Sequence, residues 1–379
     1  MRRGVLVNHA EVLGSGLIYR NPKPYLCSIH AYWPDLVMLD DGELLCSVSL
    51  ASAFESIDCR GALCRSRDNG QNWQLQGYYY EHPTDRTYSS TCRVSKMSDG
   101  SLIGVGGLFD RSNPEIGLSN PEAEFGFVDT YPFIVRSTDG GYSWTEPNIF
   151  ETPFNGSPLE ICSPIVECPD GHWLWPTSLW PMFDGACPYG MKAVALVSYD
   201  KGETWPEYVT IMDRFDEGII HWEQKIIRLD GKRMLSMCWT YDRTKNADLP
   251  ISYAISEDGG RSFNPPKSTG ILGQTCRPIY LGEGGILTAY RGSDKPGLWV
   301  NISKLDGDDW ISLLDVPLWG AEVAGLVDTE GSKTEQFQRL KFGYPSLLRL
   351  SEDEYPLCFW AVEDCISNIR WFRLRVQYP

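Results

Sequence analysis

The chain has 379 residues, of which 50 are Asp or Glu and 34 are Lys or Arg, so its net charge is −16. A surface this acidic repels phosphate backbones and anionic lipid headgroups, which argues against nucleic acid and membranes as partners. The aromatic content of 12%, together with 36 Gly and 25 Pro, is typical of a strand-rich protein with many turns.

The N-terminal residues MRRGVLVNHA contain no apolar run of signal-peptide length, and no segment is apolar over the length of a membrane span. The 12 cysteines lack close metal-ligand spacing, and several, such as Cys46 and Cys238, lie within apolar strand patterns. We therefore expect buried free thiols in a reducing cytoplasm, with no metal and no cofactor. A secreted protein with disulfides is the alternative.

An apolar strand that ends in an acidic or glycine-containing turn recurs along the chain. Its six copies begin at Tyr32, Thr91, Cys162, His221, Thr275 and Gly343. Such a segment predicts a strand, a tight turn and a returning strand.

A second motif, S-x-D-x-G-x-x-W or close to it, follows most of these segments. It begins at Ser66, Ser137, Ser198 and Ser256, with a worn copy at Ser303. Asp and Gly favour a tight turn in which the carboxylate accepts backbone N–H groups, and the aromatic residue packs back on the hairpin. The motif is therefore structural, so Asp68, Asp139, Asp200 and Asp258 are predicted to lie at the periphery and not in a catalytic site.

Together the two series predict six units of roughly 60 residues with about four strands each. Each unit buries its faces only against its neighbours, so the ring must close to hide its edges. We predict an all-β fold, a six-bladed β-propeller with Asp-box (BNR) repeats, as a single domain over residues 1–379. The run 368–376 is expected to close the ring by pairing with the N-terminal segment.

The number and order of these motifs resemble the sialidase superfamily of propellers, over nearly the whole chain. The resemblance implies an acid at Asp58, a nucleophilic tyrosine at Tyr344 and a glutamate at Glu223 that takes its proton. It also implies three arginines for the sialic acid carboxylate, but Trp33 and Trp239 stand at two of those places. The third arginine is Arg277 or Arg291. Because a carboxylate needs a cluster of guanidinium donors, the expected substrate is not ordinary sialic acid.

In a propeller the first strand of each blade lines the central channel, so polar residues at the strand starts converge. These residues are Tyr32, Thr91, Arg93, Glu160, His221, Glu223, Thr275, Arg277 and Tyr344. Two carboxylates in one hollow suit sugar hydrolysis, in which one protonates the leaving oxygen and the other attacks or activates water.

Two pairings are open. In the sialidase pairing Tyr344 attacks, Glu223 accepts its proton and Asp58 is the acid/base. In the other, Glu160 and Glu223 form a carboxylate pair that resembles the exo-arabinanases of the same superfamily. Tyr32, Trp33, Arg93, His221, Arg277 and Arg291 are the expected substrate-binding residues, and Trp222, Trp239 and Trp319 are further candidates for sugar stacking.

Each of these residues also has a structural interpretation. Glu160, Glu223 or Asp58 can be held by hydrogen bonds alone, Arg93 and Arg277 can form salt bridges with Glu160 and Glu223, and His221 and Tyr344 can be core residues.

The sequence therefore predicts an exo-acting glycoside hydrolase with a carbohydrate substrate. A uronate-specific polysaccharide lyase with His221 or Tyr344 as base, a true exo-α-sialidase and a non-catalytic glycan-binding propeller are the alternatives. The oligomeric state and the sugar are undetermined.

Overall fold

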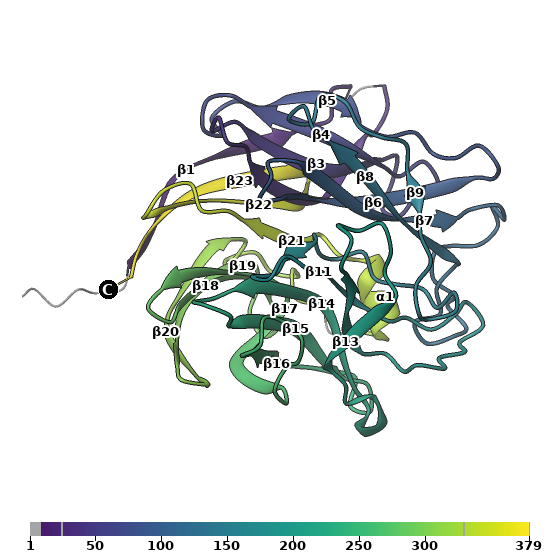
Figure 1. Ribbon diagram of the computed structural model, residues 1–379. Coiled ribbons are helices and arrows are strands. Elements are labelled where there is room, and N and C mark those ends of the chain that lie inside the picture. Colours follow the sequence, from purple (N-terminus) through teal and green to yellow (C-terminus); the bar gives the residue numbers. More distant parts are fainter. Residues whose placement is uncertain (1–8, 24–25, 329, 379) are drawn as a thin grey trace, which may run out of the picture.

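The computed structural model describes residues 9–23, 26–328 and 330–378, so the first eight residues of the predicted domain lie outside the described part. The chain is all-β, and its sheets are arranged as a propeller (Figure 1). Among the described residues, no helix has the length and apolarity needed to cross a membrane. All twelve cysteines are free, and nine of them are buried.

Four sheets have four antiparallel strands each. In spatial order the first two contain β1 (His9–Tyr19), β23 (Ile366–Gln377), β22 (Glu354–Glu363) and β21 (Phe342–Leu347); and β2 (His30–Met38), β3 (Leu44–Ala51), β4 (Arg60–Ser66) and β5 (Gln74–Tyr78). The other two contain β6 (Tyr88–Lys96), β7 (Leu102–Asp110), β8 (Thr130–Ser137) and β9 (Asn148–Ile149); and β10 (Val166–Glu167), β11 (Trp173–Ser178), β12 (Ala193–Ser198) and β13 (Glu207–Met212).

The remaining strands form one sheet of seven instead of two separate sheets. They are β14 (Ile219–Arg228), β15 (Met234–Asp242), β16 (Ala247–Ser256), β17 (Lys267–Gly282), β18 (Gly285–Gly292), β19 (Leu298–Asp306) and β20 (Asp309–Trp319). The strand β17 joins the two parts, because its first residues pair with β16 and its later residues pair with β18. Four separate four-stranded blades are therefore present, and the expectation of six separate ones is not met.

In the described part of the chain, two short helices interrupt the strands. The 3-10 helix η1 (Phe215–Glu217) precedes β14, and α1 (Lys333–Gln338) lies between β20 and β21. The helix α1 begins with a capping box, in which the Ser332 side chain accepts from the backbone of Glu335 and the Glu335 carboxylate accepts from the backbone of Ser332.

The predicted closure of the ring is confirmed. β23 pairs antiparallel with β1 from Ile369 opposite Tyr19 to Gln377 opposite His9, and Figure 1 shows the two strands side by side. The first strand of the chain therefore completes a sheet built from its last three, which hides an edge that would otherwise stay unpaired.

The four S-x-D-x-G turns share one hydrogen-bond pattern. In each, the Asp carboxylate accepts from the hydroxyl of the Ser two residues before it and from the backbone N–H four residues after it: Asp68, Asp139, Asp200 and Asp258. In the first turn the Trp73 indole N–H also donates to the Gly70 carbonyl. These carboxylates have local structural partners, and none of them lines the two hollows described below.

Candidate functional site

A hollow of about 170 Å³ lies where several sheets meet. We call it the central hollow. Its polar lining combines three carboxylates, one guanidinium, one phenol and one hydroxyl: Glu55, Glu160, Glu223, Arg93, Tyr344 and Thr91. The rest of its wall is mostly aromatic, with Trp33, Phe54, Phe109, Phe127, Trp180, Trp222, Trp239 and Phe337. Of the ten predicted site residues, Glu160, Glu223, Tyr344, Trp33 and Arg93 come together here.

Four residues of this wall have a left-handed backbone. Trp33, Glu55, Glu223 and Tyr344 have φ of 48°, 55°, 49° and 50°. Three of these residues lie within register shifts of the first strands β2, β14 and β21. A bulge turns a side chain out of the strand's normal alternation, and a positive φ in a non-glycine residue costs of the order of 1–3 kcal/mol. Strain of this kind is concentrated at functional sites, and here all four strained side chains reach the same hollow.

Glu160 and Glu223 are direct neighbours. The backbone N–H of Glu223 donates to Oε2 of Glu160 over 2.7 Å. Burial and the negative charge of Glu223 raise the pKa of Glu160 to about 7. The second carboxylate oxygen of Glu223, Oε2, is buried without a hydrogen-bond partner. A carboxyl that holds its proton near neutral pH beside one with a free oxygen has the properties of an acid and base pair.

Asp58 does not reach the central hollow. Its carboxylate is exposed and accepts from the backbone and hydroxyl of Ser52 and from the hydroxyl of Ser56, so it organises its own loop. These hydrogen bonds outweigh its partial burial and lower its pKa. The residue of this loop that faces the hollow is Glu55, and burial raises its pKa to about 7 against the opposing effect of Arg111. The sequence FESID contains both acids, and only the loop conformation shows which one points inward.

Two buried cations flank the Tyr344 ring: Arg93, which lines the hollow, and Lys225, which does not. Arg93 lies 4.4 Å from the ring centre and Lys225 lies 4.8 Å from it. Arg93 donates to the backbone carbonyls of Ile161 and Trp33, and Lys225 donates to those of Cys162 and Glu223. The Tyr344 hydroxyl also donates to the Cys162 carbonyl, and burial raises its pKa to about 12. The structural alternative for Arg93, a salt bridge to Glu160 or Glu223, is absent among the ion pairs of the described residues. Lys225 is not among the residues that the sequence predicted.

Arg277 does not line the central hollow. Its guanidinium forms an ion pair with Asp35 over 3.5 Å, and the Asp35 carboxylate also accepts from the Ser346 hydroxyl. The Asp35 side chain is only 1% exposed. Arg277 therefore compensates a buried charge on β2 and is not among the residues that line the central hollow.

Replacement of Arg277 by Met should lower the free energy of unfolding by about 3 kcal/mol, because it leaves the Asp35 carboxylate buried without its ionic partner. Urea unfolding measures this loss. The matched control is Arg67→Met, which removes a 56% exposed guanidinium from an ion pair with Glu43 and should cost less than about 1 kcal/mol. Equal losses for the two variants would contradict the assigned role of Arg277.

Two further predicted ligand residues are core residues. His221 is 1% exposed, neither ring nitrogen has a partner, and burial lowers its pKa to about 4. Tyr32 packs against Trp33, Phe54 and Trp360, with ring centres 5.3–5.4 Å apart. Neither side chain lines the central hollow, so a role for them in substrate binding stays a prediction.

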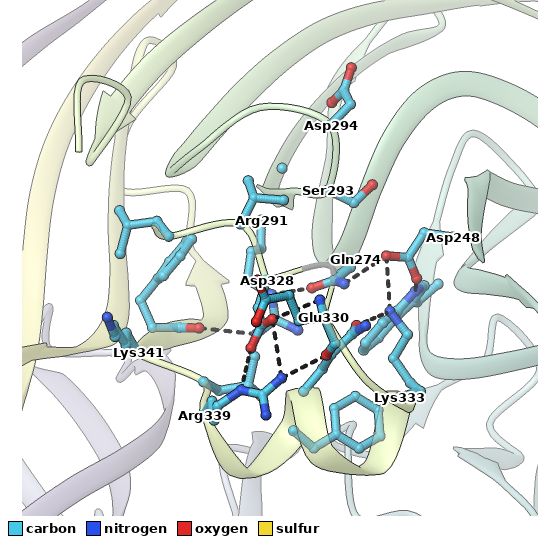
Figure 2. A pocket seen from close by; sticks show the side chains of 18 of the residues that line it. Asp248, Gln274, Arg291, Ser293, Asp294, Asp328, Glu330, Lys333, Arg339 and Lys341 are labelled. Atoms are coloured by element: carbon cyan, nitrogen blue, oxygen red, sulfur yellow. Dashed lines mark hydrogen bonds and ion pairs between the residues drawn. The ribbon is translucent and has the colours of Figure 1, made fainter. Parts of the chain in front are cut away.

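Arg291 lies at a second, larger hollow of about 590 Å³, which we call the side hollow. Figure 2 shows its lining, to which Asp248, Gln274 and Lys333 also belong. Arg291 donates to the Gln274 side chain over 2.6 Å and to the Phe342 carbonyl over 3.0 Å. Arg291 is therefore a candidate ligand contact beside the central hollow and not within it.

Of the four tryptophans predicted to stack on a sugar, three line the central hollow and one lies in the core. Trp33, Trp222 and Trp239 line the central hollow, and Trp239 also borders the side hollow. Trp319 packs against Phe342 and Phe359 in a separate core cluster. Trp33 is half-buried, so its ring is the best placed of the four for a sugar face.

Solved structures of other proteins are similar to this chain over nearly its whole length. A protein of unknown function from Dyadobacter fermentans is similar with a TM-score of 0.72 at 20% identity, over 97% of this chain and 99% of that one. The Hadza microbial sialidase Hz136 is similar with a TM-score of 0.66 at 14% identity, over 95% and 68%. An alpha-L-arabinanase of Penicillium chrysogenum, complexed with arabinobiose, is similar with a TM-score of 0.67 at 15% identity, over 96% and 98%.

No protein-family model matches the sequence, and no curated relative is found. The identities to the solved structures are low, so what these structures share with this chain is the fold. The chain has the all-β propeller fold that sialidases and arabinanases also have.

Proposed function

We propose that this protein is an exo-acting glycoside hydrolase for a neutral terminal sugar, with the central hollow as its active site. One observation carries the proposal: Glu55, Glu160 and Glu223 converge in one aromatic-lined hollow. Burial raises the pKa of two of them to about 7. Glycoside hydrolysis uses such carboxyl groups, one protonated and one ionised, on either side of the scissile bond. The similar folds of a sialidase and an arabinanase support the same class of reaction.

In the proposed mechanism Glu160 is the general acid, because its pKa keeps it protonated close to neutral pH. Its proton goes to the glycosidic oxygen as the bond to the anomeric carbon breaks. Glu223, whose Oε2 has no partner, attacks the anomeric carbon or takes a proton from the attacking water. Glu55 reaches the hollow from the loop between β3 and β4, where it is suited to accept from a sugar hydroxyl.

A neutral sugar fits the charges better than sialic acid does. Three carboxylates line the central hollow, and the one guanidinium among its described lining residues, Arg93, is occupied by two backbone carbonyls. Arg277 is paired with Asp35, and tryptophans stand at the other two places where the resemblance implies arginine. An anionic sugar would therefore find no free guanidinium cluster in the central hollow to replace its water.

We also propose that the ring has six blades within one domain. The pairing of β17 supports this count, since its first half completes a sheet with β14–β16 and its second half opens a sheet with β18–β20. The seven-stranded sheet then represents two blades that share one continuous strand.

Replacing Tyr344 by Phe separates the two proposed pairings. With the carboxylate pair as the reacting groups, the variant loses only the hydrogen bond to the Cys162 carbonyl, and kcat should fall less than about tenfold. With Tyr344 as nucleophile, turnover should fall by several orders of magnitude. Steady-state kinetics on one active substrate decides between them, and an inactive, folded Tyr344→Phe would contradict the carboxylate pairing.

The substrate class is tested with nitrophenyl glycosides of neutral sugars, N-acetylneuraminic acid and uronic acids. Release of nitrophenol from at least one neutral glycoside is expected. Release from the sialoside or uronide alone would contradict the proposal, and an unsaturated uronate product would indicate a lyase.

A further inference from the structure

The side hollow adjoins the central hollow. Three residues, Trp239, Phe337 and Leu340, line both of them. Phe337 belongs to α1 and packs 5.6 Å from the rings of Trp222 and Trp239. The two hollows are therefore neighbouring compartments with a shared apolar partition. The volume of about 590 Å³ falls within the range typical of small-ligand sites, whereas about 170 Å³ is below it.

The wall of the side hollow is held by a chain of buried polar contacts, part of which Figure 2 shows. Lys333 donates to Asp248, Gln274 donates to Asp248 over 2.8 Å, and Arg291 donates to Gln274 over 2.6 Å. Lys333, Arg291 and Gln336 are each at most 5% exposed. This network connects α1 with β16, β17 and β18, so it fixes the shape of the hollow before any ligand binds.

The network ends on an unused donor. Nη2 of Arg291 is buried and has no hydrogen-bond partner, and the residue as a whole is only 4% exposed. A buried donor without a partner costs free energy that a ligand or a water molecule at the site can recover. Because Arg291 lines the side hollow, this donor belongs to the wall that a hydrogen-bond acceptor in the hollow would face.

The lining charges indicate which kind of acceptor this is. Four acidic side chains and four basic ones surround the side hollow: Asp248, Asp294, Asp328 and Glu330, and Arg291, Lys333, Arg339 and Lys341. Two of the acids are already neutralised, Asp248 by Lys333 and Asp328 by Arg339. A balanced wall of donors and acceptors matches sugar hydroxyls, which both donate and accept, better than it matches an anion.

We propose that the side hollow binds the neutral sugar residue next to the one that is cleaved off, so that the substrate is a neutral disaccharide or a longer glycan. This inference rests on the proposed function, because it needs the bond to be cut in the adjoining central hollow. The partition of Trp239, Phe337 and Leu340 then lies beside the glycosidic linkage.

The test fills the side hollow without touching the central one. Ser293 and Asp294 lie on the far side of the side hollow from α1 in Figure 2. Ser293→Trp and, separately, Asp294→Trp are compared with the wild type on neutral disaccharides (arabinobiose, xylobiose and cellobiose) and on the matching monosaccharide fluorides, whose fluoride leaving group is too small to need the side hollow. We expect the ratio of kcat/KM for disaccharide over monosaccharide to fall at least tenfold in both variants.

Ser351→Trp, on the exposed turn between β21 and β22, is the matched control and should leave the ratio within twofold of the wild type. Titration of the same disaccharides into Glu223→Gln, with and without Ser293→Trp, measures binding apart from turnover. Unchanged ratios in both tryptophan variants, or a preference for an acidic disaccharide, would overturn the inference. Failure of the proposed function looks different, because Glu223→Gln would then turn over every active substrate at the wild-type rate.

Discussion

Replacing Glu223 with Gln is expected to lower kcat by about 10²- to 10⁴-fold, the range for loss of a positioned acid, base or nucleophile. The variant keeps the shape of the side chain and the backbone N–H that donates to Glu160 over 2.7 Å. It removes a carboxylate whose Oε2 is buried without a partner, so the fold should not suffer. Steady-state kinetics and thermal unfolding of the same preparation measure the two effects.

The matched control is Glu352→Gln, which changes an exposed carboxylate on the turn between β21 and β22. It should leave both kcat and the melting temperature unchanged. Loss of activity in Glu223→Gln together with a large fall in melting temperature would point to a structural role for Glu223. Full activity in a folded Glu223→Gln would remove it from the mechanism.

The inward-facing residues of the first strands were largely predictable from the repeat. Trp33, Glu223 and Tyr344 occupy equivalent places in three copies of one motif, and the structure gives all three a bulge and a positive φ. A periodic sequence places equivalent residues equivalently, so a ring of such units brings them together. The bulge itself has no reliable sequence signature, which is why the strain was not foreseen.

Residues on loops and the pairing of charges were harder to predict. Asp58 and Glu55 are three positions apart in one loop, and which of them faces inward depends on local hydrogen bonds from Ser52 and Ser56. The partners of Arg277 and Arg291 lie on other strands, Asp35 on β2 and Gln274 on β17. Such contacts depend on how neighbouring sheets are oriented, and a single sequence does not record that.

The division of the ring into sheets has a similar explanation. The motif spacing marks a new unit near Thr275, and the pairing of β17 does change partner between Leu272 and Gly273. The sequence around this point forms a continuous strand of 16 residues, because no turn residue pair separates the two halves. Repeat counting therefore located the unit but did not predict that two units share a strand.

Glu55→Gln and Glu160→Gln should each stabilise the protein at pH 8 and leave its stability unchanged at pH 4. The pKa of both carboxyls is raised in the folded state from 4.5 to about 7. As the pH rises above 4.5, the carboxyl ionises first in the unfolded chain, which lowers the free energy of the unfolded state, so the stability contributed by each protonated carboxyl is lost between pH 4.5 and pH 7. A shift of this size corresponds to about 3 kcal/mol for each group. Glutamine cannot ionise, so each variant keeps at pH 8 the free energy of unfolding that the wild type loses.

Urea unfolding at pH 4 and pH 8 measures the effect, with Glu352→Gln as the exposed control that should show no difference between the two pH values. Equal stability of wild type and variants at pH 8 would mean that neither carboxyl is held protonated by its surroundings. The expected gain in stability at Glu160 comes with loss of activity, since the group that is costly to ionise is also the one that holds the transferred proton. If Glu160 had only a structural role, its replacement by Gln would not both raise stability at pH 8 and abolish activity. Both effects in one variant would show that the chemistry requires the Glu160 carboxyl to be buried beside Glu223.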